Sequence, residues 1–176
     1  MSGGAVPAAA PHHQPSPGAC TGFVFICPGR FEALRGYPCA AGTGANLGRA
    51  LIVLNERLPA RFASGDRALY VITNSWPNVE YPAMTGRSVP TVDEVLRAEN
   101  LERLARELAG LAAVVACGGQ AHEAVRALRQ RGALRADVAQ ARHLSQRSVN
   151  MIPGASDTPG RIALWCEGVI AQLQGR

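Results

Sequence analysis

The sequence predicts an α/β fold with a central four-stranded parallel sheet between two layers of helices, a three-layer αβα sandwich. Short apolar runs alternate with segments of helical spacing, in the order β-α-β-α-β-α-β-α. Strands that are apolar throughout are typical of parallel sheets covered on both faces. Right-handed crossovers between such strands place helices on both sides of the sheet. With 176 residues, the chain has the size of a single domain with one core.

We expect residues 1–19 to be a disordered tail and residues 20–176 to form the single folded domain. The tail is rich in Ala, Pro, Gly and Ser, which bury little apolar surface. His12 and His13 lie in it without further ligands at useful spacing, so we assign them no metal. Neither an apolar run of roughly 18 residues nor a signal-peptide start is present. We therefore expect a cytoplasmic monomer with no membrane partner.

The charged residues and the cysteines limit the chemistry. All 18 basic residues are arginine, 13 residues are acidic, and the net charge of +5 permits a nucleic-acid partner. Without lysine, no side-chain amine can form a Schiff base. The cysteines are odd in number and contain no C-x-x-C pair, which predicts free thiols and neither a zinc ribbon nor a disulfide framework. They are Cys20, Cys27, Cys39, Cys117 and Cys166.

The first half of the expected domain contains two strands and one helix. Residues 22–27 form an apolar strand that Pro28 and Gly29 end, and a glycine-rich loop follows. Residues 46–58 have helical spacing, and residues 68–73 form the second strand, before a polar loop rich in proline. The leucines on one face of the helix are Leu47, Leu51, Leu54 and Leu58.

The second half continues the same alternation. Thr91 can cap a helix with Glu94 as its capping-box partner, and this helix is expected to run to about residue 108. The remaining expected elements are a strand at 112–117, a helix from 118 to about 131, a weak strand near 138–142 and a helix over roughly 160–173.

Polar or conformationally special residues follow each of the four strands. Ligands of open parallel sheets bind beyond the carboxyl ends of the strands, so these four places should meet in one cleft. Singly, such residues are common in turns and caps, and only their combination indicates a site. The four places are Cys27-Pro28-Gly29, Thr73-Asn74-Ser75, Cys117-Gly118-Gly119-Gln120 and His143-Leu144-Ser145.

These segments resemble, in chain order, the motifs of the uracil-DNA glycosylase superfamily. Residues 28–44 are similar to the family 4 pattern P-G-x-x-E-x-x-x-G-x-P-F-x-G-x-x-G. Residues 71–74 resemble the family's I-T-N, residues 114–121 its strand-Gly-x-x-Ala turn, and residues 143–145 its H-P-S motif. The positions that match the first pattern are Pro28, Gly29, Glu32, Gly36, Pro38 and Gly44.

The resemblance covers about residues 22–150 and implies a uracil-DNA glycosylase-like fold. It also implies a DNA glycosylase of base excision repair, which hydrolyses the N-glycosidic bond of uracil or a related base in DNA. The absence of lysine makes the expected enzyme monofunctional. The cysteines that hold an iron–sulfur cluster in family 4 have no counterparts here, so we expect no cofactor and no metal.

The resemblance assigns base recognition to the first two motifs. Asn74 would read a base flipped out of the DNA, because an amide can accept from N3–H of uracil and donate to its O4, a pairing that cytosine cannot satisfy. The residues that would line the base pocket are Pro28, Gly29, Tyr37 and Cys39, with Pro38 at the DNA.

The resemblance assigns catalysis to His143, which would stabilise negative charge on the departing base near its O2. Ile26 and Cys27 occupy the two places where family members carry the Glu, Asp or Asn that positions or activates water. Main-chain carbonyls would then have to hold the water. The amides at Gly118, Gly119 and Gln120 open a helix, where a DNA phosphate binds well, and Ser145 and Arg147 would enter or brace the duplex.

Two other classes of function remain open. A catalytically weak or inactive nucleic-acid-binding module of the same fold needs Asn74 and the glycine turns but not His143. A thiol hydrolase would use Cys117 at its strand-to-helix turn as the nucleophile and His143 as the base. A cysteine at the end of an apolar strand is, however, most simply a buried small apolar residue.

Overall fold

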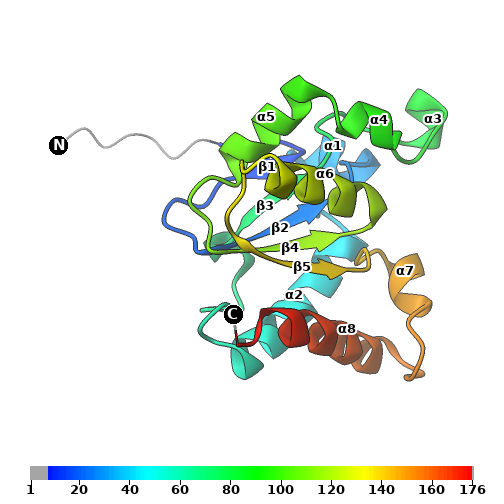
Figure 1. Cartoon of the computed structure of the whole chain (residues 1–176). Helices are drawn as coiled ribbons and strands as arrows, with labels where there is room; N and C mark the ends of the chain where they lie inside the picture. Colours follow the sequence, from blue (N-terminus) through cyan, green and yellow to red (C-terminus); the bar gives the residue numbers. More distant parts are fainter. Residues whose placement is uncertain (1–7, 176) are drawn as a thin grey trace.

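The computed structural model describes residues 8–175 and contains a five-stranded sheet in the order β1-β3-β2-β4-β5 (Figure 1). Strands β2 to β5 run parallel, and β1 pairs antiparallel with β3 at one edge. The predicted α/β fold with a mostly parallel sheet is therefore confirmed. The strands are β1 (His13–Gln14), β2 (Thr21–Phe25), β3 (Val71–Asn74), β4 (Ala113–Cys117) and β5 (Asp137–Ala141).

The edge strand β1 corrects the prediction of four parallel strands. It also lies in the segment expected to be a disordered tail, and it pairs His13 with Thr73 of β3. Residues 10–19 therefore belong to the fold, whereas residues 1–7 of the expected tail lie outside the described residues. The physical reason is that the outer edge of β3 carries main-chain groups that need partners, and this segment supplies them.

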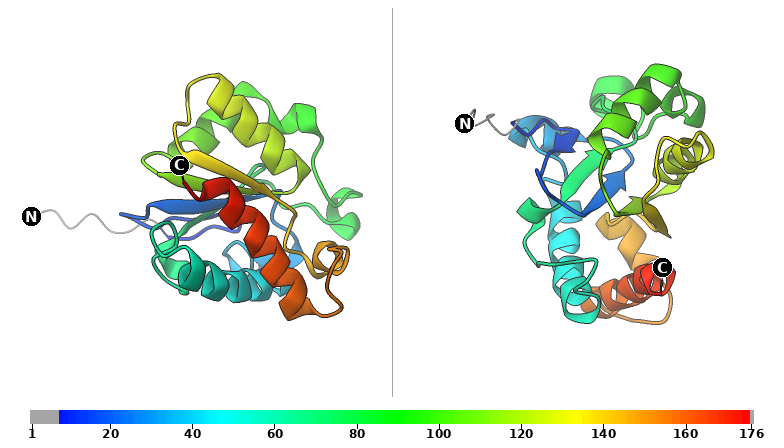
Figure 2. Two further views of the ribbon diagram at one scale, coloured as in Figure 1. Left: turned by 60° about the horizontal axis from the view of Figure 1, so that its bottom comes forward. Right: turned by 60° about the vertical axis from the view of Figure 1, so that its left-hand side comes forward.

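Two helices cover each face of the sheet (Figures 1 and 2). Helices α2 (Gly42–Arg57) and α8 (Thr158–Leu173) pack on one face, and α5 (Ala98–Glu107) and α6 (Gly119–Gln130) pack on the other. Successive strand residues point to opposite faces: Phe23 and Phe25 join the first core, and Val24 joins the second. Strand β2 is apolar at these positions because both of its faces are buried.

Short helices follow the carboxyl ends of the strands, where Figure 1 shows α3, α4 and α7 at one end of the molecule. Helices α4 and α5 were expected as one helix, but Asn100 Nδ2 donates to the carbonyl of Val95 at 2.7 Å in place of a main-chain donor. The capping box of Thr91 and Glu94 is confirmed. The short elements are α1 (Arg30–Arg35), η1 (Arg67–Leu69, a 3-10 turn before β3), α3 (Pro82–Thr85), α4 (Val92–Val95) and α7 (Gln146–Asn150).

The other expected elements are confirmed with shifted ends. Strand β2 ends at Phe25, two residues early, although the N–H of Ser75 still donates to the Phe25 carbonyl at 2.7 Å. The chain before β3 forms η1, where strand was expected. No helix within residues 8–175 is both long enough and apolar enough to cross a membrane.

Candidate functional site

The carboxyl ends of β2 and β3 and the segment after β5 bring Phe25, Asn74 and His143 together. Phe25 and Asn74 are paired in register on neighbouring strands. The ring of Phe25 lies edge-on to the imidazole of His143, with 5.5 Å between the ring centroids. The buried side chain of Phe25 therefore has Asn74 on one side and His143 on the other. The prediction from sequence missed Phe25, whose one signal is its place just before Ile26 and Cys27.

His143 is neutral at pH 7 and keeps one ring donor available. Its Nδ1 accepts the main-chain N–H of Ser145 at 3.0 Å, so the ring proton is on Nε2. Burial lowers the pKa of His143 to about 4, and the negative charge of Glu32 opposes this shift only in part. Within residues 8–175, Nε2 has no hydrogen-bond partner. The Nε2–H group can therefore donate to a ligand.

Asn74 is nearly buried, and its amide has a fixed main-chain partner. Its side chain is 3% exposed, and Nδ2 donates to the carbonyl of His12 at 3.1 Å. Oδ1 accepts no hydrogen bond from the residues described, and no fully buried side-chain oxygen there lacks a partner, so Oδ1 reaches solvent. The amide thus keeps one N–H and one acceptor without a partner among residues 8–175.

Glu32 holds the first loop together. Its carboxylate accepts the main-chain N–H of Gly29 at 3.0 Å and that of Ala40 at 3.2 Å. Pro28 is buried, and its carbonyl accepts the N–H of Glu80 at 2.9 Å. The loop that carries α1 is therefore fastened at both of its ends. A glutamate at position 32 has a structural role, because its carboxylate binds main-chain N–H groups on both sides of α1.

Arg67 holds the second part of this loop, and no pattern in the sequence indicated this role. Its guanidinium donates to the carbonyl of Pro38 at 2.5 Å and to that of Cys39 at 2.7 Å. The same group lies 5.5 Å from the ring centroid of Tyr37, which is exposed. The Cys39 side chain is buried, and burial raises the pKa of its thiol. Arg67 therefore holds the main-chain carbonyl of Cys39 at the site, whereas the Cys39 thiol is buried.

Ile26 and Cys27 offer no group that can activate water. Ile26 packs against Gly118, where an added Cβ would lie 2.7 Å from the Ile26 Cδ1. The Cys27 thiol donates to the Ser88 carbonyl at 3.4 Å. Burial, and next the charge of Glu80, raises the pKa of Cys27 to about 12, so this thiol is protonated at pH 7.

The starts of α6 and α7 carry the residues expected to contact DNA. Gly118 has φ +99, which lets the chain turn from β4 into α6, and Gly119 is exposed. The Gln120 side chain donates to a loop carbonyl at 3.0 Å. Ser145 caps α7 by accepting a main-chain N–H at 3.3 Å. Of the residues expected to contact DNA here, Gly119 and Arg147 are therefore the exposed ones.

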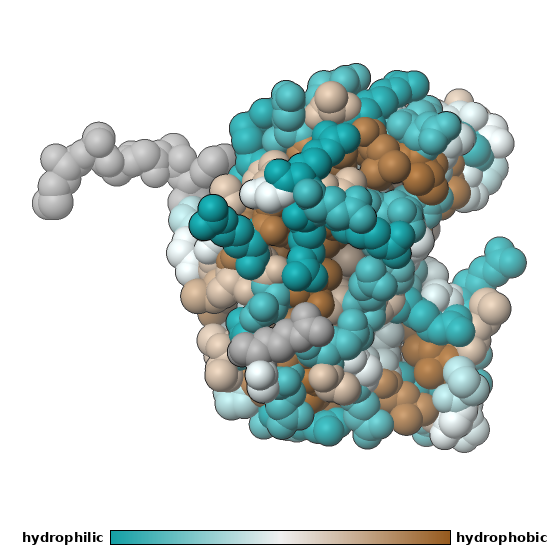
Figure 3. Space-filling model, viewed as in Figure 1, coloured by the Kyte–Doolittle hydropathy of each residue, from teal (hydrophilic) through white to brown (hydrophobic). Residues whose placement is uncertain are grey.

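Exposed apolar side chains gather at the same end. Of the nine large apolar residues exposed within residues 8–175, only Ile52 and Leu69 lie outside α1, α3, α4, α7 and the loops beside them. In Figure 3 the outline of the surface is indented between the part that carries α3 and the part that carries α7. The exposed Arg30 and Arg142 border the same end. The apolar residues there are Phe31, Leu34, Tyr37, Met84, Val89, Val92 and Met151.

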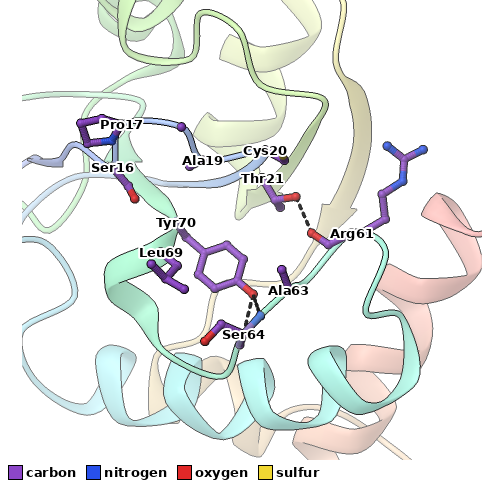
Figure 4. A pocket seen from close by; sticks show the side chains of 11 residues that line it. Ser16, Pro17, Ala19, Cys20, Thr21, Arg61, Ala63, Ser64, Leu69 and Tyr70 are labelled. Atoms are coloured by element: carbon purple, nitrogen blue, oxygen red, sulfur yellow. Dashed lines mark hydrogen bonds between the residues drawn. The ribbon is translucent and has the colours of Figure 1, made fainter.

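Five cavities within residues 8–175 lie away from Asn74 and His143. A cavity of about 210 Å³ lies at the amino ends of β2 and β3, and Figure 4 shows Tyr70 in its wall. The Tyr70 hydroxyl donates to the Ser64 carbonyl, so this polar group is already paired. None of these five cavities has Asn74, His143 or Tyr37 in its wall. The expected cleft is therefore not one of them.

The geometry of Cys117 speaks against a thiol nucleophile. Its side chain is fully buried, and burial raises its pKa well above the ordinary value. A nucleophilic thiol needs the opposite, namely exposure and a lowered pKa. Within the described part of the chain, no group of three or more His, Cys, Asp or Glu side chains could hold a metal ion.

No protein-family model and no curated protein matches this chain. The features that bear on function are therefore the arrangement of Phe25, Asn74 and His143 and the loops that hold these residues.

Proposed function

We propose that the protein is a DNA glycosylase that hydrolyses the N-glycosidic bond of uracil or a related base flipped out of DNA. The observation that carries the proposal is the neutral imidazole of His143, which keeps a free Nε2–H and contacts Phe25, the register partner of Asn74. These side chains offer the two kinds of group that the reaction needs. The motif resemblance of residues 28–44 and 143–145 supports the same proposal.

In this proposal Asn74 reads the edge of the base. Its Oδ1 accepts from N3–H of uracil, and the remaining Nδ2 N–H donates to O4. Cytosine presents an acceptor at N3 and a donor at N4. The amide oxygen of Asn74 would therefore face the acceptor N3, and its N–H would face the N4 amino donor. Such unpaired polar groups in a desolvated site disfavour cytosine. The exposed ring of Tyr37 offers a face on which the base can stack.

His143 acts on the departing base. As the bond between the sugar C1′ and the base nitrogen breaks, its electron pair moves onto the base and negative charge builds at O2. The Nε2–H of the neutral imidazole donates to that oxygen. A preorganised donor of this kind stabilises such a transition state by about 3 to 4 kcal/mol. The sugar is left with the character of an oxocarbenium ion, and water adds to C1′.

Main-chain carbonyls position the attacking water in this proposal, because Ile26 and Cys27 supply neither a carboxylate nor an amide. A positioned general base commonly contributes 10²- to 10⁴-fold to a rate. We therefore expect slow turnover, with most of the acceleration from His143 and from binding of the base.

The test is release of base from end-labelled oligonucleotides that contain uracil, as single strands and as U·G and U·A pairs, read by alkaline cleavage at the abasic site. We expect release by the wild type and a loss of about 10²- to 10³-fold in His143→Ala. The control is Arg129→Ala, an exposed position in the last turn of α6, at the end of that helix away from His143. It should retain the wild-type rate per folded molecule.

A second candidate function is a nucleic-acid-binding module without chemistry. The missing water-activating group at Ile26 and Cys27 favours it. This candidate predicts salt-sensitive DNA binding without base release, and it predicts that His143→Ala binds as the wild type does. Absence of both release and binding would reject both candidates.

A further inference from the structure

The segment that we call the N-terminal strap, residues 10–16, runs along the outer edge of β3 and reaches its carboxyl end. There the carbonyl of His12 accepts a hydrogen bond from Nδ2 of Asn74 at 3.1 Å. The Thr73 hydroxyl lies 3.2 Å from the same oxygen and 2.5 Å from the Glu107 carboxylate, and its single proton goes to only one of the two. A carbonyl oxygen accepts and cannot donate, so it pairs only with the nitrogen end of the Asn74 amide.

This pairing fixes which end of the amide faces the ligand. If the amide turned over, Oδ1 would face the carbonyl oxygen of His12 with no proton between the two oxygens, and the carbonyl would lose the bond from Nδ2. The two orientations also have opposite chemistry. The observed one leaves Oδ1 and one N–H in the order that matches N3–H and O4 of uracil. The reversed order matches N3 and the N4 amino group of cytosine.

Side chains fasten the strap on both sides of the His12 carbonyl. The ring of His12 is 3.0 Å from a carboxylate oxygen of Glu107 on α5, and this carboxylate also pairs with Arg103 at 2.6 Å. Two residues further on, Gln14 Nε2 donates to the carbonyl of Arg67 at 2.9 Å. The strap therefore connects Asn74 with the residue that holds the Pro38–Cys39 carbonyls.

We propose that the N-terminal strap sets base specificity: the His12 carbonyl holds the Asn74 amide in the orientation that reads uracil and rejects cytosine. This inference rests on the proposed function and deepens it. Asn74 remains the group that touches the base, and His12 is a positioning residue that acts through it.

The test compares the full-length wild type with His12→Ala and with His12→Ala/Gln14→Ala, which remove the side-chain anchors of the strap. The control is Pro17→Ala, an exposed position directly after the strap and outside these contacts. The measurement is single-turnover release of uracil and of cytosine from otherwise identical single-stranded oligonucleotides. We expect the uracil-to-cytosine rate ratio to fall by about tenfold in the double variant, the value of roughly one lost hydrogen bond, and to stay unchanged in the control. A merely structural role would lower both rates together and leave the ratio intact.

A second measurement does not depend on catalysis. In the wild type, the Asn74 side-chain amide proton that binds the His12 carbonyl should exchange slowly with water, as measured by NMR, and the double variant should lose this protection. Fast exchange in the wild type overturns the proposal, and so does an unchanged rate ratio in a variant whose Asn74 amide has become mobile. If the wild type has a protected amide but releases no base, the proposed function fails instead. The strap is then tested by DNA binding. The wild type should bind uracil-containing DNA more tightly than cytosine-containing DNA, and this preference should fall in the double variant.

Discussion

At the scale of single residues, main-chain groups hold the polar side chains of the candidate site. His143 accepts an N–H, Asn74 donates to a carbonyl, and Glu32 accepts two N–H groups. Asn74 and His143 could be selected from sequence because each follows an expected strand. Their partners could not all be predicted, since the Asn74 side chain binds a carbonyl 62 residues away, in a segment whose composition indicated disorder.

The lowered pKa of His143 predicts a pH-dependent stability. The unfolded chain, in which histidine has a pKa near 6.5, binds a proton between about pH 6.5 and 4 that the folded protein does not. The free energy of unfolding should therefore decrease as the pH falls through this window, by on the order of 2 to 3 kcal/mol from this group. Urea unfolding at pH 7 and pH 4.5 measures the change. His143→Gln should lose less stability than the wild type, and equal losses in the two proteins would contradict the assignment.

At the scale of elements, the sequence predicts the helices and strands whose apolar residues recur with the period of the element. Helices α2, α6 and α8 and strands β2 and β4 have buried faces that the sequence pattern records. Helix α1 has no buried residue, and β1 has two residues. Strand β1 is held by distant partners such as Thr73 and Arg67, and α1 is held by the bonds of Glu32 to main-chain N–H groups on either side of the helix. The hydropathy of a short segment carries no record of such contacts.

Two glycines of α2 predict opposite effects of the same substitution. A Cβ on Gly44 would lie 2.0 Å from the carbonyl oxygen of Cys39, which Arg67 also holds. A Cβ on Gly48 would meet nothing within 4 Å. Urea unfolding should show Gly44→Ala destabilised by about 2 to 3 kcal/mol through overpacking. Gly48→Ala should be stabilised by about 0.5 to 1 kcal/mol, because alanine favours the helix. Shifts in the same direction would mean that α2 does not start against the Cys39 carbonyl.

At the scale of the whole molecule, stability and the candidate site are located in different parts of the fold. The two cores lie between the sheet and its helices and are built largely from the strands and from α2, α5, α6 and α8. The loops at the carboxyl ends instead expose arginines and most of the exposed large apolar residues. Such a surface can bind a polyanion that presents its bases, since phosphates attract arginine and bases stack on apolar side chains.

With DNA as the proposed ligand, this separation predicts which arginines contribute to its binding. Arg147 lies on α7 at the carboxyl end of the sheet, whereas Arg129 lies in the last turn of α6, at the far end of that helix. Both are exposed, and replacing either with glutamine removes one positive charge, so the two variants have the same net charge. Each phosphate contact adds about 0.7 to the slope of log affinity against log salt concentration for single-stranded DNA. Arg147→Gln should reduce this slope by about that amount, and Arg129→Gln should leave it unchanged, as measured by fluorescence anisotropy from low to moderate salt. Equal reductions would mean that DNA responds to the overall charge of the protein, and a reduction confined to Arg129→Gln would place the DNA on the α6 side, away from Asn74 and His143.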